Sequence, residues 1–460
     1  MSFITRMLSI IFAVYFSISA AFSSAKSNKW LLKDFPSYEG GIKSTSLYDA
    51  GSGREVDWMD DSDENNNYVQ FVSKTGITEV KKYLKKLEKN GYRKIFENQI
   101  EYNSFYGYIK ADKQVYISFN SKIGEARIMD NSCSDRIDEF GYSTHGAQNS
   151  TVYQYNFPYY DPDVNTDDTI YSRNGMCYII KLSDGKLVVI DGGSANQSAE
   201  ENIRNLVSFL HEITGTQPGE KIDIALWYGT HPHSDHILVF SKALQMFRNE
   251  FNIERLAYNY QSYSNCEYNH RADWFRQQTN EIFPKAKYLK VRTGMKWDIS
   301  DAHFQVLCTH EEAVNAQTGV SEFEDANDCS SIVKITINGT SFLFTGDTDT
   351  LLQNTLLDRY NEKTLHADVI QGPHHMINKD AKLYEAVQPT YVFASQSKLR
   401  TVNYFGSYQA AKDAGVKEEN FFFASEGTYG ITPLGGGKVN ISLRQPDYVP
   451  FDGSDFTYNF

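Results

Sequence analysis

The chain has 460 residues, of which 41% are hydrophobic and 14% aromatic, and its formal net charge is −13. This composition excludes an intrinsically disordered chain, and the length exceeds what one ordinary hydrophobic core covers, so two domains are expected. The acidic charge argues against a protein held on nucleic acid by electrostatic attraction, because such proteins present clustered basic residues to the phosphates.

The first 25 residues have the pattern of a secretory signal peptide. Arg6 is followed by an apolar run at residues 8–16, and Ser23 and Ala25 form a small-x-small cleavage site. The apolar run is shorter than the ~20 residues that a spanning helix needs, and no later segment is long and apolar enough to span. We therefore expect a secreted or cell-surface protein, with an uncleaved membrane anchor as the alternative.

A small α+β domain is predicted over residues 26–149. Residues 77–92 predict a helix, because four apolar side chains recur at the spacing of one helix face, and Gly91 stands where a helix C-cap glycine belongs. These four side chains are Val80, Tyr83, Leu84 and Leu87. Strands of aromatic or β-branched character are expected at residues 68–76, 104–110, 113–119 and 125–129. No motif in this domain indicates a chemical role.

From residue 150 to residue 460 the pattern changes to strands that alternate with helices. Residues 177–182 and 186–191 predict a hairpin around a Ser-Asp-Gly turn, and helices are expected at 198–215 and 236–251. Further strands are expected at 222–228, 255–260, 286–291, 304–309, 331–337, 341–346, 367–372, 390–395 and 420–425. This alternation predicts a layered α/β architecture in which helices cover the sheets.

The turn after the apolar strand at 222–228 reads "GTHPHSDH" and contains His231, His233, Asp235 and His236. Neutral imidazoles and carboxylates are good ligands for zinc and similar ions. Four ligands are more than one open catalytic site takes from a single turn, so two metals sharing them are expected. A polar turn that collects these residues by chance is the alternative, and three histidines with one aspartate in this order argue against it.

The order H-x-H-x-D-H resembles the metallo-β-lactamase superfamily, and three further motifs in the same order extend the resemblance over about residues 150–445. They are Asp191 in "LVVIDGG", Asp347 in "SFLFTGDTD" and the pair His374–His375 in "ADVIQGPHHM". The resemblance implies an αββα sandwich, here preceded by the small α+β domain.

One branch of the superfamily is closest in pattern, the branch containing the extracellular domain of the bacterial DNA-uptake channel and the phosphorylcholine esterases. The segments "NDCSSIVKITINGTSFLFTGD", "ADVIQGPHHM" and "NYFGSYQAAKDAG" resemble it. The chain departs from this pattern at four positions. Asn327 and Asp328 stand where many superfamily members have a histidine, Met376 replaces a glycine, and Ser407 replaces a histidine.

The resemblance also implies roles for single residues. The implied ligands are His231 and His233 for the first metal, Asp235, His236 and His374 for the second, and Asp347 as a bridge between them. Asp235 and His236 are also predicted to be catalytic. His374 is preferred to His375 because it is closer to the strand end, and His375 would then face the substrate. Asp191, Asn327 and Asn403 are expected in the second shell or near the substrate.

Together these features predict a secreted metal-dependent hydrolase with two zinc ions per chain, or one as the alternative. A water activated between two cations would attack an ester or phosphodiester of a small molecule or of the cell surface. A β-lactam or lactone hydrolase and a nuclease remain open as alternatives, although the acidic charge makes nucleic acid an unfavourable partner. A non-catalytic surface module that retains the fold is the alternative from a different functional class.

Overall fold

The structure is a computed structural model that describes residues 28–49, 54–56, 68–157, 175–194, 200–260, 279–316, 323, 326–377, 381–404 and 406–444. The predicted signal peptide lies outside the described residues. The chain divides into two compact units, Met1–Cys133 with Val314–Glu322, and Ser134–Ala313 with Phe323–Phe460.

The second unit begins before the predicted boundary at residue 150. The segment after Ser134 packs within this unit, because the Ser134 hydroxyl accepts a hydrogen bond from the backbone N–H of Lys290 over 2.8 Å. The Phe140 ring also meets the Trp297 ring edge-on, with 5.5 Å between the centroids. The predicted boundary at residue 150 therefore lies inside the second unit.

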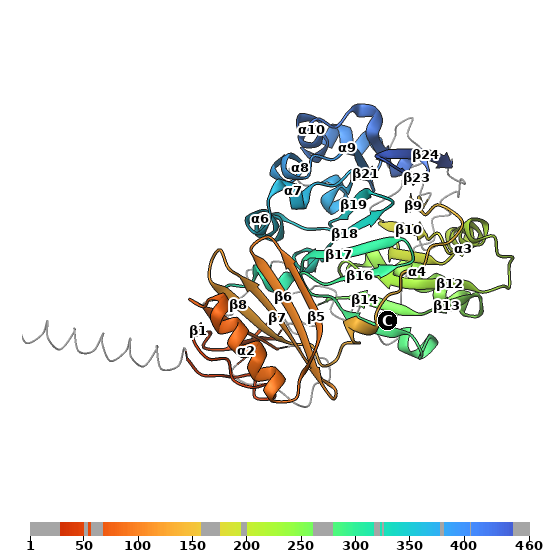
Figure 1. Ribbon diagram of the computed structural model, residues 1–460. Helices are drawn as coiled ribbons and strands as arrows, with labels where there is room; N and C mark the ends of the chain where they lie inside the picture. The colour runs from red at the N-terminus through yellow and green to blue at the C-terminus, as the bar shows by residue number, and fades with distance from the viewer. Residues whose placement is uncertain are drawn as a thin grey trace, which may run out of the picture. The chain divides into compact units, whose positions relative to one another are not determined.

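In its described residues the first unit is an antiparallel sheet with the helix α2 (Ile77–Lys89) on one face, as Figure 1 shows. Its strands are β1 (Ile42–Lys43), β2 (Leu47–Asp49), β3 (Arg54–Val56), β4 (Tyr68–Ser73), β5 (Arg93–Ile100), β6 (Asn103–Lys110), β7 (Lys113–Asn120) and β8 (Glu125–Asp130). They are ordered β3-β2-β4-β8-β7-β6-β5, with β1 beside β4. The predicted apolar stripe of α2 is buried in the core of this unit, so the helix and its orientation are confirmed.

The second unit contains two larger sheets. Among the described residues the first has nine strands in the order β15-β14-β12-β11-β10-β9-β23-β24, with β13 beside β12. These strands are β9 (Thr151–Gln154), β10 (Cys177–Lys181), β11 (Leu187–Asp191), β12 (Ile222–Tyr228), β13 (Phe251–Ile253), β14 (Arg255–Tyr258), β15 (Lys287–Lys290), β23 (Thr428–Gly435) and β24 (Lys438–Arg444). Within it, β11, β12, β14 and β15 run parallel.

The other sheet of this unit has seven strands in chain order among the described residues. They are β16 (Lys296–Ile299), β17 (Ala302–Cys308), β18 (Ile332–Ile337), β19 (Thr340–Phe344), β20 (Val369–Gln371), β21 (Tyr391–Ala394) and β22 (Phe421–Phe423). The last four of these strands are parallel. Parallel strands need crossover connections, and helices supply most of them here.

The two sheets of the second unit pack face to face. Tyr178 of β10 lies between Phe344 of β19 and Phe393 of β21, with ring centroids 5.1 Å and 5.6 Å away. Helices α3 (Glu200–Thr214) and α4 (Ser234–Met246) bury their apolar faces on the outer side of the nine-stranded sheet.

Further helices lie along the seven-stranded sheet in Figure 1, namely α6 (Thr350–Arg359), α7 (Glu362–Leu365), α8 (Ala381–Val387), α9 (Lys398–Tyr404) and α10 (Gly406–Asp413). The predicted αββα sandwich is therefore confirmed. In the described part of the chain, none of the helices combines the length and the apolarity needed to cross a membrane.

The parallel strands decide where a site can form. The carboxyl ends of β11, β12, β19, β20 and β21 carry Asp191, the His231–His236 turn, Asp347, the His374–His375 pair and Ser395. Strands that run parallel deliver the residues after their carboxyl ends to the same edge of a sheet, and this edge is where α/β proteins place their sites.

Candidate metal centre

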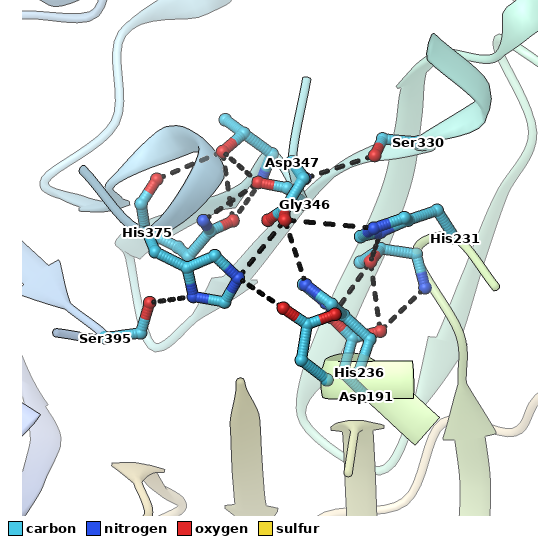
Figure 2. A network of polar contacts seen from close by, with 12 residues as sticks. Asp191, His231, His236, Ser330, Gly346, Asp347, His375 and Ser395 are labelled. Carbon is cyan, nitrogen blue, oxygen red and sulfur yellow. Dashed lines mark hydrogen bonds and ion pairs between the residues drawn. The ribbon is translucent and has the colours of Figure 1, made fainter. Parts of the chain in front are cut away.

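The turn between β12 and α4 brings its histidines into the interior. His231 and His236 are fully buried, and their ring centroids lie 4.0 Å apart. His233, at the N-cap of α4, is half-buried. Figure 2 shows His231, His236 and His375 arranged around Asp347.

Asp191 holds this turn in place. Its carboxylate accepts hydrogen bonds from the backbone N–H of Thr230 over 2.8 Å and from the Thr230 hydroxyl. It also accepts a hydrogen bond from Nδ1 of His236 over 2.7 Å. Since Nδ1 then carries the proton, Nε2 of His236 is left with a lone pair directed into the site, as in carboxylate–histidine–metal arrangements. The second-shell position predicted for Asp191 agrees with this geometry.

Asp347 lies at the middle of the cluster. Its Oδ2 atom is 3.2 Å from Nε2 of His236, 3.2 Å from Nε2 of His375 and 3.8 Å from Nε2 of His231. Its backbone N–H donates to the Ser330 hydroxyl over 3.1 Å. Gly346 precedes it with φ of +58°, a conformation that permits the close approach of Ser330 and Thr230. The predicted bridging position of Asp347 is therefore consistent with its place between the histidines.

The structure corrects the choice between the paired histidines. The side chain of His375 is 1% exposed, and its Nε2 lies 3.2 Å from both Asp235 Oδ2 and Asp347 Oδ2. The side chain of His374 is 25% exposed and instead directs Nδ1 toward Asp349, 3.2 Å away. His375 therefore takes the inner position that the sequence assigned to His374.

The physical reason lies in the backbone of η6 (Pro373–Met376). His374, His375 and Met376 all have positive φ, at 45°, 52° and 68°. A left-handed conformation costs about 1–2 kcal/mol per non-glycine residue, and such strain collects at functional sites. The reversed turn rotates the second histidine of the pair, rather than the first, into the interior. Nδ1 of His375 is held by the Ser395 hydroxyl at 3.2 Å.

The electrostatics of the cluster follow from burial and close charges. Burial opposes ionisation of Asp347, but the attraction of His236 and His375 outweighs it and holds the pKa of Asp347 well below its usual range. Burial likewise disfavours the charged form of His375, but Asp347 and Asp235 raise its pKa to about 9. For His231 burial is the stronger influence, and with the neighbouring His236 it keeps the pKa of His231 well below its usual range.

The hydrogen bonds of these residues indicate whether the residues fit a metal ion. Four buried atoms in the cluster make no hydrogen bond of good geometry with the described residues, namely Nε2 of His231, His236 and His375, and Oδ1 of Asp347. The 3.2 Å contacts of His236 and His375 with carboxylate oxygens are close ion pairs. Buried polar atoms are normally paired, because leaving them unpaired costs stability. Here the three Nε2 atoms surround the Asp347 carboxylate, and a cation bound among them would satisfy them together. The donor set fits a metal ion.

The ligand atoms form two groups that share Asp347. We call Asp235, His236, Asp347 and His375 the tetrad, and His231, His233 and Asp347 the triad. Within each group, one ligand atom of every residue lies within 4.8 Å of the others. This arrangement suits two ions with Asp347 between them.

Two residues that were predicted near the site, Asn327 and Asn403, belong to neither ligand group. Asn327 is buried in η5 (Ala326–Cys329), three residues before Ser330. Asn403, predicted near the substrate, is exposed on α9. Sequence reasoning missed Ser330 and Ser395, although Ser395 directly follows an apolar strand, the same signal that identified the ligands.

No model of a known protein family matches the sequence, and no curated protein matches it. Solved structures are similar to parts of it. The diiron β-hydroxylase CmlA from Streptomyces venezuelae matches 62% of this chain at 12% identity, with a TM-score of 0.33. The alignment covers 54% of CmlA, so this chain spans about half of that protein.

Two further solved structures are similar to smaller parts of this chain. Zn²⁺-bound PqqB from Methylobacterium extorquens matches 48% of this chain and 71% of its own, at 7% identity and a TM-score of 0.30. A B3 metallo-β-lactamase with an active-site glutamic acid matches 38% of this chain and 57% of its own, at 15% identity and a TM-score of 0.22.

Proposed function

We propose that this chain is a metal-dependent hydrolase of the metallo-β-lactamase superfamily with a binuclear zinc centre. One observation carries the proposal. Three buried imidazole Nε2 atoms, of His231, His236 and His375, face the carboxylate of Asp347 and make no hydrogen bond of good geometry with the described residues. The tetrad and the triad would hold the two ions.

Two bound zinc ions would supply a Lewis acid for the scissile bond and lower the pKa of a water molecule. The chain's own residues prepare the site for that chemistry. Asp191 and Ser395 hold the rings of His236 and His375 with Nε2 directed inward. The burial of these rings keeps bulk water away from them and strengthens electrostatic interactions inside.

The proposed substrate is an ester or phosphodiester of a small molecule or of the cell surface. The resemblance to the branch of the phosphorylcholine esterases supports this choice, and the signal-peptide pattern supports a secreted or cell-surface location. The net charge of −13 opposes a polyanionic nucleic acid as substrate. Hydrolysis of a β-lactam or lactone would use the same metal ligands, and a module without turnover could retain them.

The proposal is tested by turnover of chromogenic esters and phosphodiesters, with a chromogenic β-lactam and a lactone in parallel. We expect ester or phosphodiester hydrolysis that a chelator abolishes and added zinc restores. Hydrolysis confined to the β-lactam or the lactone would show that the substrate belongs to that class and is not an ester or phosphodiester of the kind proposed. A chain that binds zinc but turns over none of the substrates would support the non-catalytic module.

A second candidate is an iron-dependent oxidoreductase. The triad has two histidines and one carboxylate, a composition that also suits non-haem Fe(II). Elemental analysis of protein expressed with both metals available separates the two candidates. Zinc in the purified chain supports the hydrolase, whereas iron with an absorption band in the visible range supports the oxidoreductase.

A further inference from the structure

His375 is held from behind by the hydroxyl group of Ser395. Figure 2 shows Ser395 on the side of the His375 ring that faces away from Asp347. The Ser395 Oγ atom lies 3.2 Å from Nδ1 of His375, and both residues are buried. A serine hydroxyl can accept a hydrogen bond or donate one, so this contact alone does not fix which ring nitrogen of His375 carries the proton.

The direction of this hydrogen bond decides whether His375 can bind a cation. When its Nδ1–H donates to Ser395, Nε2 keeps a lone pair that faces Asp347. When Ser395 donates instead, the neutral ring carries its proton on Nε2 and offers no lone pair to a cation. His236 is free of this ambiguity, because the carboxylate of Asp191 opposite its Nδ1 can only accept.

Tyr178 of β10 is placed to act on Ser395. Its ring packs between those of Phe344 and Phe393, with centroids 5.1 Å and 5.6 Å away. Phe393 and Ser395 are two positions apart at the end of β21, and side chains at this spacing point to the same face of a sheet. The side chain of Ser395 therefore faces the layer from which Tyr178 projects.

The electrostatics of the Tyr178 hydroxyl agree with this placement. Burial, with the charge of Asp191, holds the pKa of Tyr178 well above its usual range, and a hydrogen bond with the Ser395 side chain lowers it in part. The hydroxyl makes no hydrogen bond of good geometry with the described residues. Its oxygen is thus available as an acceptor for the Ser395 hydroxyl.

We propose that Tyr178 is a positioning residue for the tetrad and acts through Ser395. The phenolic oxygen accepts a hydrogen bond from the Ser395 hydroxyl, which leaves the Ser395 oxygen to accept from Nδ1–H of His375. Without the phenolic hydroxyl, Ser395 is free to turn and donate to Nδ1, which favours the tautomer of His375 that binds no cation. This inference rests on the metal centre of the proposed function and adds a residue, outside both ligand groups, that prepares it.

The first test is Tyr178→Phe, which removes the hydroxyl and keeps a ring between Phe344 and Phe393. We expect the zinc affinity of the full chain, measured by titration of the metal-free protein against a competing chelator, to fall roughly three- to tenfold. The visible absorption spectrum of the cobalt(II)-loaded chain is the second readout, because it reports the ligands around the ion, and its bands should shift or weaken.

Tyr83→Phe is the matched control. The Tyr83 hydroxyl is also buried without a hydrogen bond of good geometry, but it belongs to the core of the first unit. Both readouts of this variant should equal those of the wild type, so that a change in Tyr178→Phe alone cannot be attributed to the loss of any buried hydroxyl.

Substitutions of Ser395 separate a relay from a purely structural effect. Ser395→Ala should weaken zinc binding by at least about tenfold, and Ser395→Thr, which keeps a hydroxyl, should restore most of the affinity. In the Ser395→Ala background, Tyr178→Phe should cause no further loss, because the phenolic hydroxyl acts through Ser395. Equal losses from Tyr178→Phe in both backgrounds would overturn the relay.

The outcomes distinguish this inference from the proposed function. Wild-type zinc affinity with an unchanged cobalt spectrum in Tyr178→Phe would overturn the inference and leave the proposed function in place. A wild-type chain that binds no metal would overturn both. If Tyr178→Phe does not fold, the Ser395 variants decide: rescue by threonine supports the inference, and wild-type affinity in Ser395→Ala overturns it.

Discussion

His374 and His375 are adjacent in the sequence and occupy different environments. His375 is enclosed by Asp235, Asp347 and Ser395, and His374 meets Asp349 at a more open position. The spacing from the strand end favoured the first histidine. In the structure, three consecutive non-glycine residues have left-handed φ values, and the second histidine, His375, points inward. No residue type in this segment indicates that conformation.

Substitution of each histidine separates their roles. His375→Ala removes a tetrad ligand, so we expect the zinc affinity to fall by at least about tenfold. His374→Ala leaves both ligand groups complete and should keep the wild-type zinc content. Zinc content after dialysis is the measurement. Equal zinc loss in the two variants, or a larger loss in His374→Ala, would refute the inner position of His375.

At the scale of elements, the site is a consequence of where parallel strands end. The apolar runs that end in Asp191, His231, Asp347 and His375 are visible in the sequence, and this is why most of the candidate ligands could be predicted. Strands with half-exposed or interrupted patterns could not. β5 alternates irregularly, β24 is an exposed edge strand, and β23 contains one proline and two glycines, which disfavour a strand prediction.

The turn between β19 and Asp347 gives a test at this scale. An added Cβ at Gly346 would lie 2.9 Å from Ser330 Oγ and 3.0 Å from the Thr230 side chain. Gly339 also has positive φ, at +81°, but a Cβ there would meet nothing within 4 Å. Gly346→Ala should therefore lower both thermal stability and zinc content, whereas Gly339→Ala should lower stability by only about 1 kcal/mol.

Thermal unfolding and zinc content of the two glycine variants check this expectation. Equal effects of both substitutions on zinc content would show that the crowding around Gly346 does not position Asp347.

Across the full chain, the layered architecture could be predicted from the alternation of strands and helices, and the ligand motifs indicated the αββα sandwich. The start of the second unit at Ser134 did not follow, because the alternation of strands and helices that set the predicted boundary begins only near residue 150. The tertiary partners of the segment after Ser134, in the strands near Trp297 and Lys290, cannot be inferred from local sequence.

A buried group far along the chain from the ligand motifs predicts how stability changes with pH. His310 is fully buried beside Glu311, which pairs with Arg292, and burial lowers the pKa of His310 to about 4. The folded state therefore binds fewer protons than the unfolded state between about pH 6.5 and pH 4, so the free energy of unfolding falls as the pH drops through this range. For His310 alone the loss between about pH 7 and pH 5 is about 2 kcal/mol.

The pKa of Glu311 is lowered to about 2, because the attraction of Arg292 and His310 outweighs its burial. Its contribution is thus retained until the pH falls below about 4.5, outside the interval from pH 7 to pH 5 in which His310 is tested. His310→Gln should lose less stability than the wild type between pH 7 and pH 5 in denaturant unfolding. His303→Gln, at an exposed position, should match the wild type. An unchanged pH dependence in His310→Gln would contradict the account of this buried group.

If Asp347 and the histidines around it hold metal, the zinc content of the purified chain shows it without recourse to activity. We predict that the purified wild-type chain binds zinc, up to two ions per chain. Asp347→Ala, which removes the ligand common to both groups, should lose both ions while retaining the helical and strand content of the fold. A folded Asp347→Ala variant with the zinc content of the wild type, or a wild-type chain that binds no metal, would contradict a metal centre around Asp347.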